Sequence, residues 1–108
     1  MQGDTRFILI MSTCPEAGVA ENIAQVLVTE RIAACVNIIP GLVSQFRWGD
    51  RIEHAHEHLL LIKTTRDRYR DVEKKILAMH PYTLPEIIGV PITQGLGDYL
   101  NWIDQETK

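Results

Sequence analysis

Three histidines at alternate positions form the sharpest chemical pattern in the chain. His54, His56 and His58 occupy every second place of the run EHAHEH. In a β-strand such residues point to one face, with neighbouring imidazoles about 6.5 to 7 Å apart and the outer pair about 13 Å apart. Neighbouring imidazoles can bind one metal ion, and copper(II) has the highest intrinsic affinity, with zinc also suitable. A solvated strand face that happens to carry histidines explains the pattern equally well.

A second group of candidate ligands lies elsewhere in the sequence. Cys14 precedes Pro15 and Glu16, which are typical of a helix start. A helix dipole there would lower the pKa of the thiol and favour a metal-binding thiolate, although a small capping residue is the commoner use of such a position. His80 is interpreted first as a free polar side chain at a helix end and second as a ligand. Cys35 is predicted to be an inert core residue.

The histidines lie in a segment from Ala33 to Thr64 that is predicted to form two long strands turning at Gly49-Asp50. The predicted register pairs Trp48 with Arg51, Gln45 with His54, Val43 with His56 and Gly41 with His58, with a bulge expected at Pro40-Gly41. Each arm is far longer than a typical strand, so the tip should project beyond the sheet. Because the tip carries Phe46 and Trp48, we expect it to pack on another copy of the chain.

The remaining elements complete one architecture. Strands are predicted at Phe7–Thr13 and Pro85–Thr93, and helices at 15–31, from the Thr64-Thr65 cap to His80-Pro81, and at Asp98–Glu106. Their order predicts an α+β fold of the ferredoxin-like split βαβ type, with an extra C-terminal helix. Such a sheet has helices on one face, and an oligomer would have to cover the other.

Composition narrows the function classes. The 108 residues carry a net charge of −3, so we expect a single domain, 1–108, that folds without a metal and does not bind nucleic acid. No apolar run is long enough for a membrane span, and the acidic N-terminus does not resemble a signal peptide. Two cysteines are too few for a disulfide framework, so a cytoplasmic protein with free thiols is predicted. The sequence shows no nucleophile and base at a convincing spacing, so we do not expect an enzyme.

Six sequence blocks resemble, in order and spacing, the CutA family of divalent-cation tolerance proteins: Glu30–Asn37, Phe46–Trp48, Leu61–Thr64, His80–Tyr82, Pro85–Ile88 and Tyr99–Trp102. The resemblance implies a cytoplasmic homotrimer whose hairpin reaches a neighbour, and a role in metal tolerance with binding of divalent copper. Some members are assigned copper ligands at positions that hold Ser12, Met79 and His80 here, so only His80 matches. We therefore expect the alternating histidines to bind metal instead of, or beside, the family site.

The resemblance also leaves a second class of function open. CutA subunits are similar to those of the PII signalling trimers. If this chain is a sensor of that kind, a cleft between its subunits would bind a small molecule or anion. The residues expected at that cleft are Lys63, His80, Tyr82, Glu86 and Trp102. This alternative rests on fold analogy alone. A stable scaffold that affects metal tolerance indirectly is also compatible with the sequence.

Overall fold

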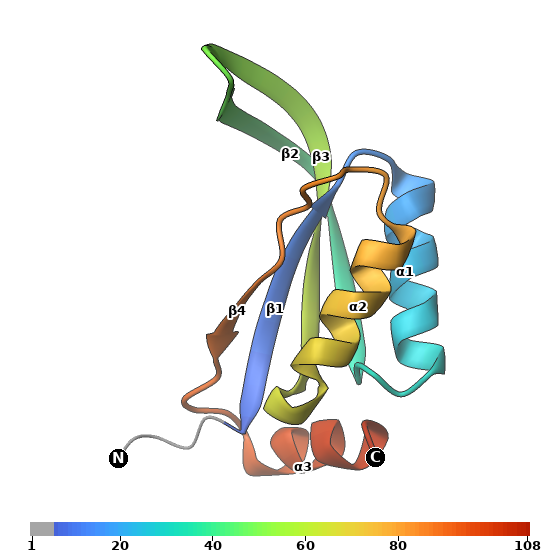
Figure 1. The fold of residues 1–108 in the computed structure, drawn as a ribbon. Helices are drawn as coiled ribbons and strands as arrows, with labels where there is room; N and C mark the ends of the chain where they lie inside the picture. The colour runs from blue at the N-terminus through green and yellow to red at the C-terminus, as the bar shows by residue number, and fades with distance from the viewer. Residues whose placement is uncertain (1–5) are drawn as a thin grey trace.

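The computed structural model describes residues 6–108, so the first five residues of the predicted domain 1–108 lie outside the described residues. The elements are β1 (Phe7–Cys14), α1 (Ala17–Thr29), β2 (Cys35–Trp48), β3 (Arg51–Thr65), a 3₁₀ turn (Arg66–Arg68), α2 (Tyr69–Met79), β4 (Ile88–Pro91) and α3 (Gly97–Glu106). The strands form one antiparallel sheet in the order β2-β3-β1-β4 (Figure 1). The predicted α+β fold with split βαβ topology is confirmed.

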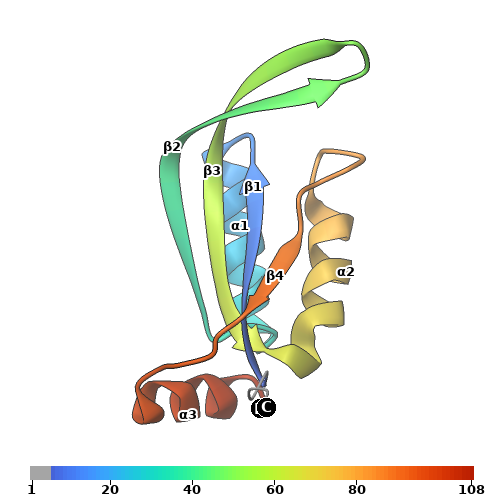
Figure 2. The ribbon, with the colours of Figure 1, turned by 90° about the vertical axis from the view of Figure 1, so that its left-hand side faces the viewer.

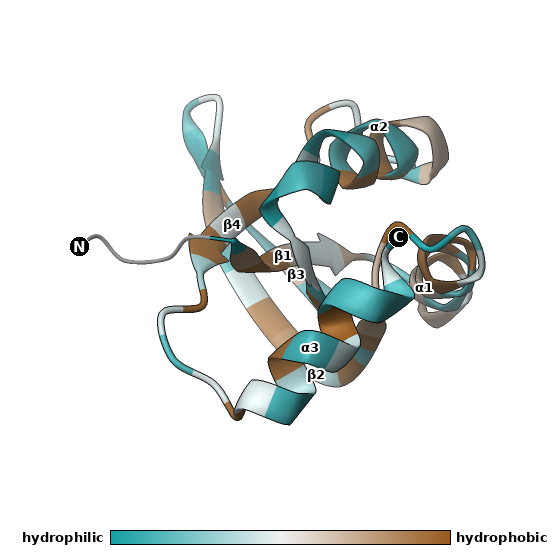
Figure 3. Cartoon of the chain, turned by 90° about the horizontal axis from the view of Figure 1, so that it is seen from below, coloured by the Kyte–Doolittle hydropathy of each residue, from teal (hydrophilic) through white to brown (hydrophobic). Residues whose placement is uncertain are grey.

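The core lies between the sheet and the helices α1 and α2, which cover the same face (Figure 1). Ile10 and Ile62 are direct partners in β1 and β3, and both are fully buried against Ile23 of α1 and Ile76 of α2. Figure 3, seen from the α3 end, shows the sheet beside α1 and the mostly hydrophilic α2. Burial of these branched side chains is the main source of stability. No helix within residues 6–108 is long and apolar enough to span a membrane.

No helix of residues 6–108 covers the opposite face of the sheet (Figure 2). Its apolar residues are half-buried in the two central strands and exposed at the edge strand β4: Leu9, Met11, Leu59, Leu61, Ile88 and Val90. Cys35 pairs with Lys63 on this open face and is half-buried, so the prediction of a core position was wrong. Cys14 points to the helix-covered face and is fully buried, so the two free thiols lie on opposite sides of the sheet.

The long hairpin forms as predicted. The pairs Trp48 with Arg51, Gln45 with His54, and Val43 with His56 are present, and Gly49 takes a φ of 65° in the turn. The register shifts between Ile39 and Leu42, which confirms the bulge at Pro40-Gly41 and removes the predicted pair of Gly41 with His58. Gly41 has a φ of 82°, a conformation that favours glycine. Beyond this bulge the hairpin projects from the sheet (Figure 1).

Several predicted boundaries differ from the structure. Helix α1 begins at Ala17 instead of residue 15, because the pairing of β1 with β3 keeps the chain extended as far as Cys14, and Glu16 is still extended with a φ of −135°. Thr65 belongs to β3 and makes no capping hydrogen bond to the helical turn that follows. Strand β4 has only four residues, because only these pair with β1.

Candidate functional site

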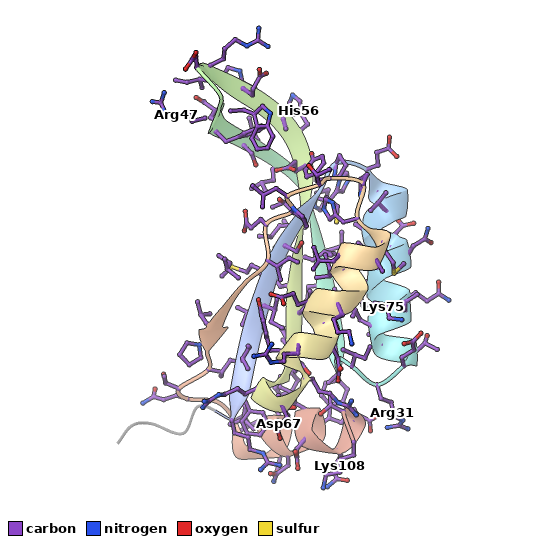
Figure 4. The ribbon with its side chains drawn as sticks, viewed as in Figure 1. Arg31, Arg47, His56, Asp67, Lys75 and Lys108 are labelled. Carbon is purple, nitrogen blue, oxygen red and sulfur yellow. The ribbon has the colours of Figure 1, made fainter. Side chains whose placement is uncertain are left out.

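The three alternating histidines share one side of β3 but differ in their surroundings. His54 and His56 lie on the projecting hairpin and are exposed, and neither imidazole forms a hydrogen bond or ion pair among the described residues. Figure 4 labels His56 on the hairpin, well away from the three helices. His58 lies within the sheet and is half-buried. Within residues 6–108, no three His, Cys, Asp or Glu side chains gather in a group that could hold a metal ion.

Cys14 lies directly opposite His58 in the pairing of β1 with β3. Burial in the core, and secondly the negative charge of Glu57, raise the pKa of the Cys14 thiol to about 11. The predicted lowering of this pKa was wrong, because the thiol lies at the end of a buried strand and not in the first turn of α1. The prediction of a capping residue was wrong for the same reason. Without a bound cation, Cys14 remains a neutral thiol at physiological pH.

His80 is buried, and both of its ring nitrogens are occupied. Its Nδ1 accepts a hydrogen bond from the backbone N–H of Tyr82 at 3.1 Å, so the neutral ring carries its proton on Nε2 and donates it to the carbonyl of Thr13 at 2.7 Å. The prediction of a free polar side chain was therefore wrong. Metal binding by His80 would require one of these hydrogen bonds to break. The ring instead ties the end of β1 to the segment that follows α2.

Glu57 is a buried carboxylate whose role the sequence analysis missed. Only 6 % of the residue is exposed, and its two oxygens accept hydrogen bonds from Ser44 Oγ at 2.7 Å and from Tyr82 Oη at 3.0 Å. Burial, followed by the hydrogen bond to Glu57 and its charge, raises the pKa of the Tyr82 phenol. Glu57 shares a strand face with Leu59 and Leu61, and an acid in line with apolar residues was the available signal for a buried carboxylate.

A groove of about 810 Å³ lies between the hairpin and residues 82–86, with Glu57 and Tyr82 in its lining. Figure 2 shows the hairpin curving over one end of the sheet. Of the predicted cleft residues, Tyr82 and Glu86 line the groove, and His80 packs against Tyr82 with ring centroids 4.8 Å apart.

The other two predicted cleft residues do not line this groove. Lys63 lies on the open face of the sheet, where its Nζ donates to Asn37 Oδ1 at 2.6 Å. Trp102 lies on α3 and packs against Tyr99 with ring centroids 5.4 Å apart. A single chain therefore brings together His80, Tyr82 and Glu86 but not the full predicted set.

Comparisons with known proteins agree with one another. The family described as CutA1 divalent ion tolerance protein matches residues 8–106. The Divalent-cation tolerance protein CutA of Thermus thermophilus is 44% identical over 99 residues, which cover 92% of this chain and 96% of that protein. The crystal structure of CutA from Xylella fastidiosa has a TM-score of 0.93 and 47% identity, covering 95% of this chain and 99% of that one. The structure of an Archaeoglobus fulgidus CutA, described as a periplasmic divalent cation tolerance protein, has a TM-score of 0.92 and 39% identity, covering 94% and 99%. On this evidence the chain belongs to the CutA1 divalent ion tolerance family.

Proposed function

We propose that this protein is a homotrimeric metal-binding protein, not an enzyme, that binds copper(II) and more weakly zinc(II) through the hairpin histidines as part of cation tolerance. One observation carries the proposal: His54 and His56 are exposed on the same side of β3 and have no protein partner within the described chain. An ion can bind both imidazoles without breaking any hydrogen bond. Membership of the CutA1 divalent ion tolerance family supports a divalent metal ion as the ligand.

The geometry of the hairpin suits two imidazole ligands. Alternate residues of a strand are about 6.5 to 7 Å apart, and the rings can converge on one ion with about 2 Å from each nitrogen. Nearby Glu53 is engaged by Arg51 at 2.9 Å and lies on the other side of the strand. The remaining coordination positions are therefore assigned to water or to another copy of the chain. Copper(II) is favoured over zinc(II) by intrinsic affinity for such ligands.

Calorimetric titration of copper(II) and zinc(II) into metal-free protein tests this site. The variant His54→Gln/His56→Gln should lose copper(II) affinity by about 10-fold or more, because both direct ligands are removed. His80→Gln is the matched control, because both of its ring nitrogens are already hydrogen-bonded inside the protein. Equal copper(II) affinity in the native protein and the double variant would exclude the hairpin as the site.

The homotrimer is proposed from the apolar surface that one chain leaves uncovered. Trp48 and Ile52 on the hairpin are 56% and 61% exposed, and Ile88 and Val90 on the open sheet face are also exposed. Exposed apolar surface of this kind is typical of an interface between copies. Light scattering coupled to size exclusion should give the mass of three chains. A monomer at micromolar concentration would contradict the proposal.

A cytoplasmic location is proposed because both cysteines are free and lie on opposite faces of the sheet, an arrangement suited to a reducing compartment. Fractionation of cells expressing the protein should recover it with cytoplasmic markers, and recovery with periplasmic or organellar markers would contradict this.

The alternative function, a sensor of small molecules, has less support, because Lys63 and Trp102 do not line the groove that holds Tyr82 and Glu86.

A further inference from the structure

Among residues 6–108, two buried side-chain atoms have no hydrogen-bond partner. They are Ser12 Oγ and His58 Nδ1, both shielded from solvent. Ser12 pairs with Leu60 and Cys14 pairs with His58, so these polar side chains occupy adjacent rows on the helix-covered face of β1 and β3. Buried polar groups are nearly always satisfied by protein or by water, so these two side chains on one face of the sheet are candidates for binding a further group.

The thiol of Cys14 completes this cluster. Cys14 is fully buried and forms no disulfide, because Cys35 lies on the opposite face of the sheet. Directly opposed residues of an antiparallel pair have Cβ atoms about 4.5 to 5.5 Å apart. A thiolate sulfur and an imidazole nitrogen bind one metal ion at about 2.3 and 2.0 Å. The pairing of Cys14 with His58 therefore brings a sulfur and a nitrogen ligand within reach of a common ion.

We propose that Cys14 Sγ and His58 Nδ1 bind one copper(I) ion in a buried site that is separate from the exposed histidines of the hairpin. The inference extends the proposed metal-binding function but uses neither His54 nor His56. Thiolate is a soft ligand that selects copper(I). Copper(I) accepts two ligands in a near-linear arrangement, whereas zinc(II) needs four. Residues 6–108 contain no group of three or more His, Cys, Asp or Glu side chains that could hold a metal ion.

The surroundings favour a single positive charge. Glu57 is next to His58 in β3 and is buried, so its negative charge attracts a cation bound nearby. When the sulfur–copper bond forms, the thiol proton passes to solvent and the copper stays in the +1 state. No electron is transferred. His58 is half-buried as a residue, whereas its Nδ1 atom is shielded from solvent.

A water molecule bridging Ser12 Oγ and His58 Nδ1 is the competing occupant, and it would satisfy both orphaned atoms without involving sulfur. The two possibilities differ in their dependence on the thiol. Copper(I) binding requires Cys14, whereas a bridging water does not.

An anaerobic competition titration distinguishes them. Copper(I) is supplied as its acetonitrile complex to the full chain, against a chromophoric copper(I) chelator. We expect one ion per chain, with sulfur-to-copper charge-transfer absorption. Cys14→Ser and His58→Gln should each weaken copper(I) binding by roughly 100-fold. This is the upper end of the loss caused by removing residues that only orient a metal ligand, and each of these variants removes a direct ligand. Cys35→Ser and His56→Gln are the matched controls and should bind as the native protein does.

X-ray absorption of the loaded protein gives an independent readout, with one sulfur and one nitrogen expected around copper. A spectrum without sulfur, or equal copper(I) affinity in native protein and Cys14→Ser, would overturn the proposal. Thermal unfolding without copper checks that the variants fold, and Cys14→Ala replaces Cys14→Ser if the latter does not. The variant His54→Gln/His56→Gln separates the two sites: it should lose copper(II) binding and keep copper(I) binding, so either proposal can fail alone.

Discussion

Alkaline pH should destabilise the native protein through Cys14. The thiol pKa rises from 9.0 to about 11 on folding, mainly because the group is buried. Between these two pH values the unfolded chain has lost the thiol proton and the folded chain retains it, so the unfolded state binds fewer protons. The free energy of unfolding therefore falls as pH rises. A shift of two units corresponds to at most about 2.7 kcal/mol, and about 2 kcal/mol of this is lost by roughly pH 10.5.

Urea unfolding at about pH 8 and about pH 10.5, at one fixed chain concentration, measures this loss. Other groups titrate in the same range, so the informative quantity is the difference between the native protein and Cys14→Ala. The native protein should lose about 2 kcal/mol more than Cys14→Ala over this interval. Cys35→Ala, which changes the thiol on the open face, should behave like the native protein. An equal loss in native protein and Cys14→Ala would refute the argument that burial controls this thiol.

Three further substitutions test individual contacts by urea unfolding at neutral pH. Tyr82→Phe removes one of the two hydroxyl donors to the buried carboxylate of Glu57 and should destabilise the protein by about 1–3 kcal/mol. Thr64→Val leaves the buried carbonyl of Ile32 without the 2.6 Å hydrogen bond from Thr64 Oγ1, at a cost of about 1–2 kcal/mol. Gly49→Ala meets no steric contact but forces alanine to a φ of 65°, at a cost of about 1 kcal/mol.

Each of these substitutions has a matched control. Tyr99→Phe changes an exposed tyrosine and should alter stability by less than about 0.5 kcal/mol. Thr64→Ser keeps the hydroxyl and should recover most of the loss seen for valine. Gly18→Ala lies inside α1 with open space around it and should stabilise the protein by up to about 1 kcal/mol. A control that destabilises the protein as much as its test substitution does would contradict the assigned contact.

The hairpin could be predicted in detail because its signals are local. Alternation along a strand fixes which side chains share a face, and Gly49 supplies the turn conformation. Proline cannot donate to the ladder, so Pro40-Gly41 indicated the bulge that the structure contains. The fold class followed from the order of elements, since a split βαβ topology needs only their sequence and approximate length.

The surroundings of the candidate site could not be predicted, because they join distant parts of the chain. The hydrogen bond of His80 to Thr13 spans 67 positions, and that of Tyr82 to Glu57 spans 25. No spacing rule connects such residues. The error at Cys14 has a similar origin: Pro15 resembles a helix start, but pairing with β3 keeps the strand extended through Cys14. Tertiary pairing overrode a local signal, and the expected direction of the thiol pKa reversed with it.

The unbroken alternation of β3 explains how this one strand contributes to both proposed metal sites, although its partner β2 contains a bulge. The extra residue lies on β2, so on that strand the side facing the helices changes from even positions such as Ile38 to odd positions such as Val43. Strand β3 has no extra residue, and its alternation continues unbroken from the sheet into the hairpin. His58 and His56 therefore point to the same side, yet only His58 lies opposite Cys14. A slip of β3 by one residue would put Glu57 opposite Cys14 and move the histidines to the other face, so register alone decides both proposed sites.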